Sequence, residues 1–415
     1  MTGKSTKFST ALGCAIGALW FLALPEAHAT TVETVAAFAG NNGAVPTNGN
    51  LLVSGQALYG ATFGGGTADL GTVFQMPTSG SAGAVTIHAF SGSDGARPNG
   101  GLVADSQGNL YGTTSLGGAA DLGTVFKLAK PTGQGTPWTL TLLHSFAGPE
   151  GAHPAAGLSE GPDGSLYGVA YDGGTMPCIA LLQFPEGCGT VFKISTAGTF
   201  KVLHAFSGYP FDGAGPGTNL AIDPQGVVIG TTNKATNSGD GGSLFAIRPT
   251  GTFVNVSEFF PKALQGYPIG NIVRDPDGNV FGMTELAGGL GSSEQGTGIW
   301  EVTAETHKQV LLKILDGQIA KSGVVRDAAG TLYGTTTGSS MGQGVTNAGS
   351  VFALDRNGTL TTYATLTFAN HAPVGGVILD QAGALWGTSS AGGQLCQSGA
   401  SPGAAGCGTV FRVTP

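Results

Sequence analysis

The chain has 415 residues, of which 74 are glycine, and it is 41% hydrophobic but only 10% charged. This much apolar surface excludes an intrinsically disordered chain, and a net charge of −8 without a basic run argues against nucleic-acid binding. A glycine-rich, charge-poor chain with short runs of Val, Thr and Phe is typical of an all-β domain with many tight turns.

Residues 1–29 have the three parts of a secretory signal peptide. A start with two lysines precedes an apolar run over residues 11–24, and an Ala-His-Ala site ends at Ala29. A retained membrane anchor is the alternative, but a span needs about 20 apolar residues. We therefore expect cleavage after Ala29 and an exported mature chain of residues 30–415, extracellular or periplasmic, with no membrane span.

One motif recurs seven times along this mature chain. A Leu-Tyr-Gly-Thr-Thr-like phrase is centred on Gly60, Gly112, Gly168, Gly230, Gly282, Gly334 and Gly387. Each copy is followed by a Gly-Thr-Val-Phe-like phrase and preceded by a Gly-Leu-Val-x-Asp-like phrase, and most copies contain a further phrase that ends in Phe. Short β-branched and aromatic phrases between Gly, Pro, Asp and Ser are typical of strands, and four per repeat match a propeller blade.

The two ends of the mature chain complement each other. Residues 31–38 resemble the phrase that ends in Phe, but they precede the first repeat. Residues 408–413 are a Gly-Thr-Val-Phe phrase with nothing after it. We therefore predict a seven-bladed β-propeller of four antiparallel strands per blade, in which the N-terminal strand pairs into the last blade and removes a free sheet edge.

These phrases resemble a known family. Gly-Thr-Val-Phe-Lys at 123–127, Leu-His-Ser-Phe at 143–146, Asp-Gly-Ala-Arg-Pro at 94–98 and Gly-Asn-Leu-Tyr-Gly-Thr-Thr at 108–114 are similar to the repeats of the choice-of-anchor tandem repeat GloVer-containing family. The resemblance covers nearly the whole mature chain. It implies a secreted propeller and no established shared activity.

The connections differ in length between the two ends of the ring. Asp-x-x-Gly sequences at 105–108, 275–278 and 327–330 predict tight turns between first and second strands, so we interpret their aspartates as turn formers rather than metal ligands. The loops between second and third strands are long, and links such as 91–100 and 207–218 should emerge beside them. We call this end of the ring the crown and the other end the short-turn face. Variable loops on a rigid scaffold make the crown the candidate binding face.

Four cysteines remain in the mature chain. Cys188 and Cys407 each stand directly before Gly-Thr-Val, and Cys178 and Cys396 lie earlier in the same two loops. Repeat symmetry predicts the pairs Cys178–Cys188 and Cys396–Cys407, each worth about 2–3 kcal/mol through loop entropy. A zinc site is the rival, but no histidine lies near these loops and export favours oxidation.

Catalytic motifs are weak. No HExxH, Walker A or zinc-finger spacing occurs, so we expect no metal and no cofactor. Two Gly-x-Ser-x-Gly matches, at 338–342 and 399–403, are discarded because neither lies on a strand-to-helix elbow. His88, His144 and His204 recur within the motif, which favours packed or hydrogen-bonded histidines over catalytic ones.

Residues that break the repeat are better candidates. Aromatic residues beside carboxylates and cations suit stacking against sugar rings with hydrogen bonds to hydroxyls. The candidate binding residues are Arg97, His153, Tyr171, Asp172, Tyr209, Phe211 and Tyr267. Further loop carboxylates are Asp69, Asp121 and Asp240. Ordinary loop capping is the alternative for all of these. Arg274 and Arg326 share one inner-strand position, where they either form an anion site or pair with acidic neighbours.

Two functions stay open. One is a monomeric, secreted binding or scaffold protein whose crown holds an extracellular glycan or a cell-surface partner. The other is an extracellular hydrolase or lyase that acts on a polysaccharide or lactone at the mouth of the central channel. Polar loop residues are spread over many blades rather than gathered in one pocket, which favours binding.

Overall fold

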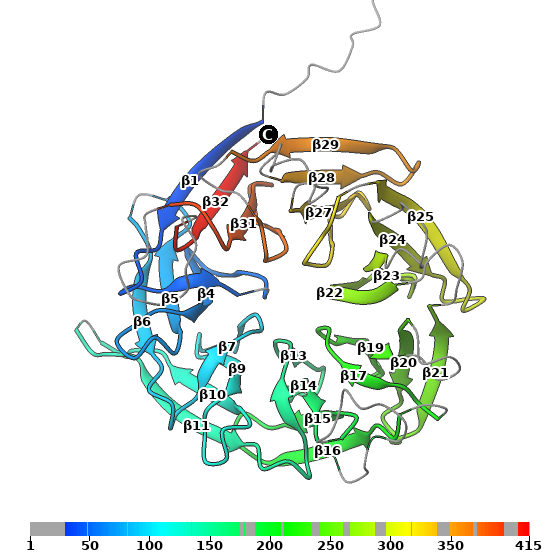
Figure 1. Cartoon of the computed structure of the whole chain (residues 1–415), viewed down its shortest axis with the longest axis horizontal. Helices are drawn as coiled ribbons and strands as arrows, with labels where there is room; N and C mark the ends of the chain where they lie inside the picture. Colours follow the sequence, from blue (N-terminus) through cyan, green and yellow to red (C-terminus); the bar gives the residue numbers. More distant parts are fainter. Residues whose placement is uncertain are drawn as a thin grey trace, which may run out of the picture.

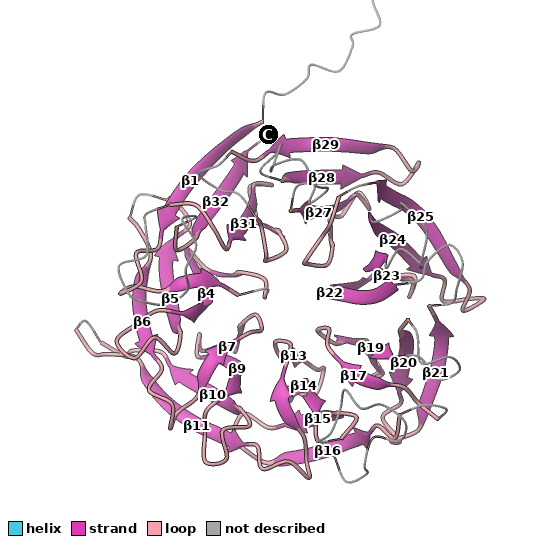
Figure 2. Ribbon diagram, viewed as in Figure 1, coloured by secondary structure: helices cyan, strands magenta, loops and turns pink. Residues whose placement is uncertain are grey.

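The computed structural model describes residues 30–47, 49–80, 82–133, 135–174, 178, 187–208, 211–234, 241–259, 266–286, 296–316, 318–337, 349–367, 372–393 and 406–414. The regular elements of these residues are β-strands, which form seven antiparallel sheets around one axis (Figures 1 and 2). The predicted seven-bladed propeller is confirmed. Residues 1–29, the expected signal peptide, lie outside the described part of the chain.

Each blade has four strand positions from the axis outwards. The innermost strands are β2 (Ala44–Pro46) with β3 (Leu52–Ser54), β7 (Ala96–Pro98) with β8 (Val103–Ala104), β12 (Ala152–Pro154) with β13 (Ser159–Glu160), β17 (Ala214–Pro216) with β18 (Ala221–Ile222), β22 (Gly266–Arg274), β26 (Val325–Arg326) and β30 (Ile378–Leu379). The second strands are β4 (Ala57–Gly64), β9 (Leu110–Leu116), β14 (Leu166–Asp172), β19 (Val228–Lys234), β23 (Val280–Leu286), β27 (Leu332–Thr336) and β31 (Leu385–Ser389). The third strands are β5 (Thr72–Pro77), β10 (Thr124–Ala129), β15 (Thr190–Ile194), β20 (Ser243–Ile247), β24 (Gly296–Val302), β28 (Ser350–Leu354) and β32 (Thr409–Thr414). The outer strands are β6 (Val85–Ala89), β11 (Thr139–Ser145), β16 (Phe200–Ala205), β21 (Phe253–Glu258), β25 (Gln309–Asp316), β29 (Leu360–Thr365) and, for blade 7, β1 (Thr31–Ala37).

The glycine of each Leu-Tyr-Gly-like phrase lies against the aromatic ring of the next phrase. A Cβ atom placed on Gly60 would lie 2.4 Å from Cζ of Phe74, and one on Gly112 would lie 2.6 Å from Cζ of Phe126. The same contact recurs in all seven blades, with Trp300 as the aromatic residue of blade 5. The repeat therefore uses glycine there because any side chain would displace a ring that fills the core.

A second contact joins each blade to the next one. Gly123 has a φ of 97°, and a Cβ atom on it would lie 2.6 Å from Cδ of Pro154 in blade 3. One residue earlier, the carbonyl of Leu122 accepts a hydrogen bond of 2.9 Å from the backbone N–H of His153. We call this pair of contacts the blade latch.

The complete latch recurs at four of the junctions. The corresponding glycine–proline pairs are Gly408–Pro46, Gly71–Pro98, Gly123–Pro154 and Gly189–Pro216. At each of them the residue before the proline donates its backbone N–H to the preceding blade over 2.7–2.9 Å. Hydrophobic clusters fill the space between blades; one of them combines Phe146 of blade 2 with Phe192 of blade 3.

The ring is closed by pairing of the two chain ends. β1 pairs antiparallel with β32, with Thr31 opposite Thr414 and Ala37 opposite Thr409. Glu33 also accepts a 2.6 Å hydrogen bond from Arg412 across this pair. Blade 7 therefore takes its outer strand from the N-terminal segment, as the sequence predicts, and the outer edge of β32 is covered.

One predicted disulfide is present in the crown. Cys178 and Cys188 are bonded, with their Cα atoms 4.9 Å apart, in the loop between β14 and β15. Cys407 is disulfide-bonded, but its expected partner Cys396 lies outside the described residues. The Cys396–Cys407 pairing therefore stays a prediction.

Replacing Gly123 with Ala tests the blade latch. The added methyl group would meet the Thr114 carbonyl oxygen at 2.4 Å in a backbone conformation that L-residues rarely adopt. We expect the free energy of unfolding to fall by about 2–5 kcal/mol. Gly133→Ala is the control, because it has open space around it. Equal denaturation midpoints for the two variants would contradict the latch.

Removing residues 31–38 from the mature protein tests ring closure. The deletion leaves β32 without a partner, and an unpaired edge promotes aggregation. We expect a large fall in melting temperature and oligomers in size-exclusion chromatography. A truncated protein that is as stable and as monodisperse as the parent would show that β1 is dispensable.

Peptide mapping without reduction tests the cysteine pairs. We expect two short cross-linked fragments, one joining Cys178 with Cys188 and one joining Cys396 with Cys407. Reduction should cost about 2–3 kcal/mol of stability per bridge, because each bridge closes a loop of about ten residues. A bridge between blades 3 and 7, or free thiols in the purified protein, would refute the pairing.

Candidate functional site

Several inner strands carry, at their crown end, a residue with an unusual backbone conformation. The middle residue of the Ala-x-Pro segment has a positive φ: 56° at Arg97 and 51° at His153. Arg97 lies in β7 and His153 in β12, so both are inner-strand residues and not loop residues as the sequence suggested. The register of β12 with β14 is regular on both sides of His153, so the left-handed backbone conformation, and not an inserted residue, orients the side chain. The repeated strand architecture therefore sets the direction of these two side chains.

Contacts between side chains link blades 3, 4 and 5 along this end. His153 Nδ1 lies 3.1 Å from Oδ2 of Asp172 at the end of β14. The neighbouring Tyr171 accepts a 3.5 Å hydrogen bond from Nδ2 of Asn233 in blade 4. Lys234 Nζ donates over 3.4 Å to the hydroxyl of Tyr267 in blade 5 and lies 4.9 Å from its ring centroid. We call the set of His153, Tyr171, Asp172, Asn233, Lys234 and Tyr267 the rim cluster.

The rim cluster combines apolar ring surface with hydrogen-bonding groups. Lys234 is 8% exposed, so its cation is held inside the structure beside the Tyr267 ring. On the blade 6 side, Lys321 Nζ lies 3.2 Å from Oε2 of Glu285, and both side chains are exposed. The polar contacts therefore continue over four blades.

Other candidates lie apart from the rim cluster. The Arg97 guanidinium lies 5.1 Å from the ring centroid of Phe63 and donates over 3.2 Å to the Phe63 carbonyl, between blades 1 and 2. Phe211 is 63% exposed in the link between blades 3 and 4. Tyr209 lies outside the described residues. The structure thus brings together four of the seven predicted site residues: His153, Tyr171, Asp172 and Tyr267.

Two of the loop aspartates form turns. Asp69 and Asp121 both have positive φ, and each accepts a 2.7 Å hydrogen bond on Oδ1 from a glycine N–H four residues earlier. Asp69 and Asp121 therefore cap their own loops, which is the alternative that the sequence analysis gave for them. Asp240 lies outside the described residues.

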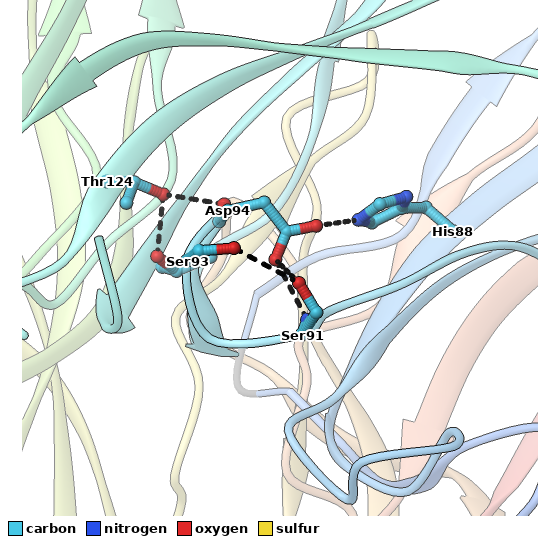
Figure 3. Close-up of polar contacts among 6 residues, drawn as sticks. His88, Ser91, Ser93, Asp94 and Thr124 are labelled. Atoms are coloured by element: carbon cyan, nitrogen blue, oxygen red, sulfur yellow. Dashed lines mark hydrogen bonds and ion pairs between the residues drawn. The ribbon is translucent and has the colours of Figure 1, made fainter. Parts of the chain in front are cut away.

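The recurrent histidines hold the links between blades in place. His88 Nε2 lies 2.9 Å from Oδ2 of Asp94, whose other oxygen accepts hydrogen bonds from Ser91 (Figure 3). His204 and Asp212 repeat the contact at 2.8 Å. In blade 2, burial lowers the pKa of His144 although the nearby Glu150 acts to raise it. The His144 ring stacks on Phe200 with centroids 3.8 Å apart. His88 and His204 are thus hydrogen-bonded and His144 is packed, in line with the interpretation of these histidines as packed or hydrogen-bonded.

The short-turn aspartates also have structural partners. Asp105 Oδ1 accepts hydrogen bonds from the N–H groups of Gln107 and Asn109, and its Oδ2 accepts one of 2.9 Å from the Tyr111 hydroxyl. Burial acts to raise the pKa of Asp105, but these hydrogen bonds lower it on balance. The carboxylate therefore organises the turn and anchors Tyr111, as expected for a turn former.

Arg274 and Arg326 reach back to the preceding blade. Nη2 of Arg274 lies 3.9 Å from Oδ2 of Asp223, and Nη2 of Arg326 lies 3.8 Å from Oδ2 of Asp275. Both aspartates belong to first-to-second turns. Of the two alternatives raised by the sequence, pairing with acidic neighbours is the one that the structure contains.

Sequence reasoning missed Asn233 and Lys234. Asn233 stands three residues after the repeat glycine Gly230, as Tyr171 stands three residues after Gly168. Comparing this one position across the seven repeats would have found it. Lys234 is the next residue, and its contact with Tyr267 depends on how closely blades 4 and 5 approach.

The described residues contain no helix that is long and apolar enough to cross a membrane. Within the same part of the chain, no three His, Cys, Asp or Glu side chains gather as a metal site would require.

Comparison with known proteins shows both fold and family. The structure is similar to an oligogalacturonate lyase from Vibrio parahaemolyticus, with a TM-score of 0.55, 11% sequence identity and 94% of each chain covered. It is also similar to an oligogalacturonate lyase in complex with manganese, with a TM-score of 0.51, 10% identity, and 93% of this chain and 90% of that one covered. At such identities the likeness is one of fold alone. No curated protein matches the sequence. The model of the Gloeobacter/Verrucomicrobia repeat matches residues 17–241, more than half of the sequence, and the chain therefore belongs to this repeat family.

Proposed function

We propose that the chain is an exported binding protein whose crown, at the rim cluster of blades 3–5, holds an extracellular glycan. The observation that carries the proposal is the set of contacts His153–Asp172, Tyr171–Asn233 and Lys234–Tyr267 at the crown end of blades 3–5, two of which cross from one blade to the next. Tyrosine rings supply apolar area at low entropic cost, and the amide and imidazole groups suit sugar hydroxyls.

The scaffold beneath the rim cluster favours binding. Pairing with β12 places Asp172 opposite Ala152, pairing with β15 holds β14 as far as Ala170, and the Cys178–Cys188 bridge closes the loop that follows. A surface that is ordered before the ligand arrives loses less conformational entropy on binding. Phe211, exposed in the adjoining link, would extend the contact surface.

Export is part of the same proposal. A disulfide persists in oxidising compartments, and residues 1–29 have the pattern of a signal peptide. A cell-surface glycan or protein would meet the crown there, and we propose that the mature chain works as a monomer.

A hydrolase or lyase is the second candidate. His153, held at 3.1 Å by Asp172, is the arrangement in the rim cluster that general acid–base chemistry would use. The same panel of glycans therefore tests both candidates, because cleavage products distinguish an enzyme from a binder.

A glycan array with the mature protein, followed by affinity measurement on the hits, tests the proposal. Phe211→Ala and Tyr267→Ala should each weaken binding by about 1–3 kcal/mol, because each removes an aromatic ring from the contact surface. Ser106→Ala with Ala328→Ser is the control on the exposed short turns and should bind as the parent does.

If the control variant lost binding and the crown variants kept it, the binding face would be the short-turn face and the proposal would be wrong. Release of shortened oligosaccharides during the incubation, abolished by His153→Asn, would favour the enzyme.

A further inference from the structure

A groove lies between blades 3 and 4 on the short-turn face, at the opposite end of the ring from the rim cluster. Its volume is about 490 Å³, within the range of sites that hold small molecules. Tyr167, Val228 and Ile247 form its apolar floor, and all three belong to the hydrophobic cluster that joins the two blades. The groove is therefore an opening at the edge of a packed core.

The walls of the groove carry an excess of positive charge. Lys193, Lys201 and Arg248 line it, against a single carboxylate from Asp163. The chain as a whole has 17 Lys and Arg residues and a net charge of −8. Three of these few cations thus surround one groove, and an anion is the ligand that complements them.

One of the three cations is fixed and the other two are exposed. Lys193 forms an ion pair with Asp163 and lies 5.4 Å from the ring centroid of Tyr167. The hydrogen bond to Asp163 raises the pKa of Lys193, so this amine is positive at neutral pH. Lys201 in β16 and Arg248 in the turn after β20 are exposed on the two walls.

The remaining polar groups of the groove are neutral donors and acceptors. They are the hydroxyls of Ser165, Ser195, Thr199 and Thr250 and the amide of Gln225. Such groups match a ligand with several hydroxyls, while the cations match its charge. We propose that this groove is a second binding site, for a polyhydroxylated anion such as a sugar acid or a sugar phosphate.

A second groove on the short-turn face lacks this excess of cations. Between blades 7 and 1, on the same face, a groove of about 560 Å³ is lined by one cation, Arg412, and one carboxylate, Asp380. Arg412 pairs with Glu33, and Asp380 accepts a 2.8 Å hydrogen bond from Trp386. Of these two grooves, the one between blades 3 and 4 has the excess of cations.

Ligand-observed saturation-transfer NMR on the mature protein tests the proposal. Four probes separate the contributions: glucuronate and glucose 6-phosphate carry hydroxyls and an anion, glucose lacks the anion, and acetate lacks the hydroxyls. We expect saturation transfer to glucuronate, to glucose 6-phosphate or to both, and little transfer to glucose or acetate. The charged sugar that binds shows whether the site takes a carboxylate or a phosphate.

Paired variants locate the site. Lys201→Gln with Arg248→Gln should weaken binding at least tenfold, because both exposed cations are lost. Lys308→Gln with Arg356→Gln makes the same charge change in the turns between third and outer strands of blades 5 and 6, and should bind as the parent does. Circular dichroism confirms that both double variants fold.

Three results would overturn the proposal: no transfer to either charged sugar, equal transfer to acetate, or equal weakening by the two double variants. The crown proposal is independent of all three, since its test uses Phe211 and Tyr267.

Discussion

The contact between a glycine of one blade and a proline of the next is the constraint on which the propeller depends. Gly123 approaches Pro154 so closely that a single methyl group would not fit, and the adjoining Leu122 carbonyl holds the N–H of His153. The latch sets the distance between neighbouring blades. The aromatic residues between blades then pack at that distance, and the pairing of β1 with β32 joins blade 7 back into the ring.

The same latch prepares the candidate site. Its hydrogen bond uses the N–H of the residue before the proline, and this residue has a positive φ, as at His153. Residues at the ends of the second strands, such as Tyr171 and Asn233, then come within reach across the blade boundary. The blade latch thus repeats at several junctions, while the side chains beside it differ from blade to blade. These side chains can change without a change in the latch itself.

The sequence predicted the ring well and the site less well, for physical reasons. Blade number and ring closure follow from counting strand phrases, and residues 31–38 are the one phrase left over. The sequence indicates links between blades rather than inner strands at Arg97 and His153, because a positive φ at a non-glycine residue leaves no clear signal in the sequence. The contact of Lys234 with Tyr267 depends on blade spacing and rotamers, which the repeat pattern does not encode. The groove between blades 3 and 4 has no signal in the sequence, because its cations come from β15 and β16 of blade 3 and from a turn of blade 4.

Hydrogen–deuterium exchange with and without the tightest glycan from the array tests the central claim, that the crown of blades 3–5 is the binding face. The account predicts slower exchange in segments 171–172, 214–217, 232–234 and 266–268, which carry or adjoin the rim cluster, and no change in the short turns at 105–109 and 327–331. Protection confined to the short turns, or spread evenly over all seven blades, would contradict it.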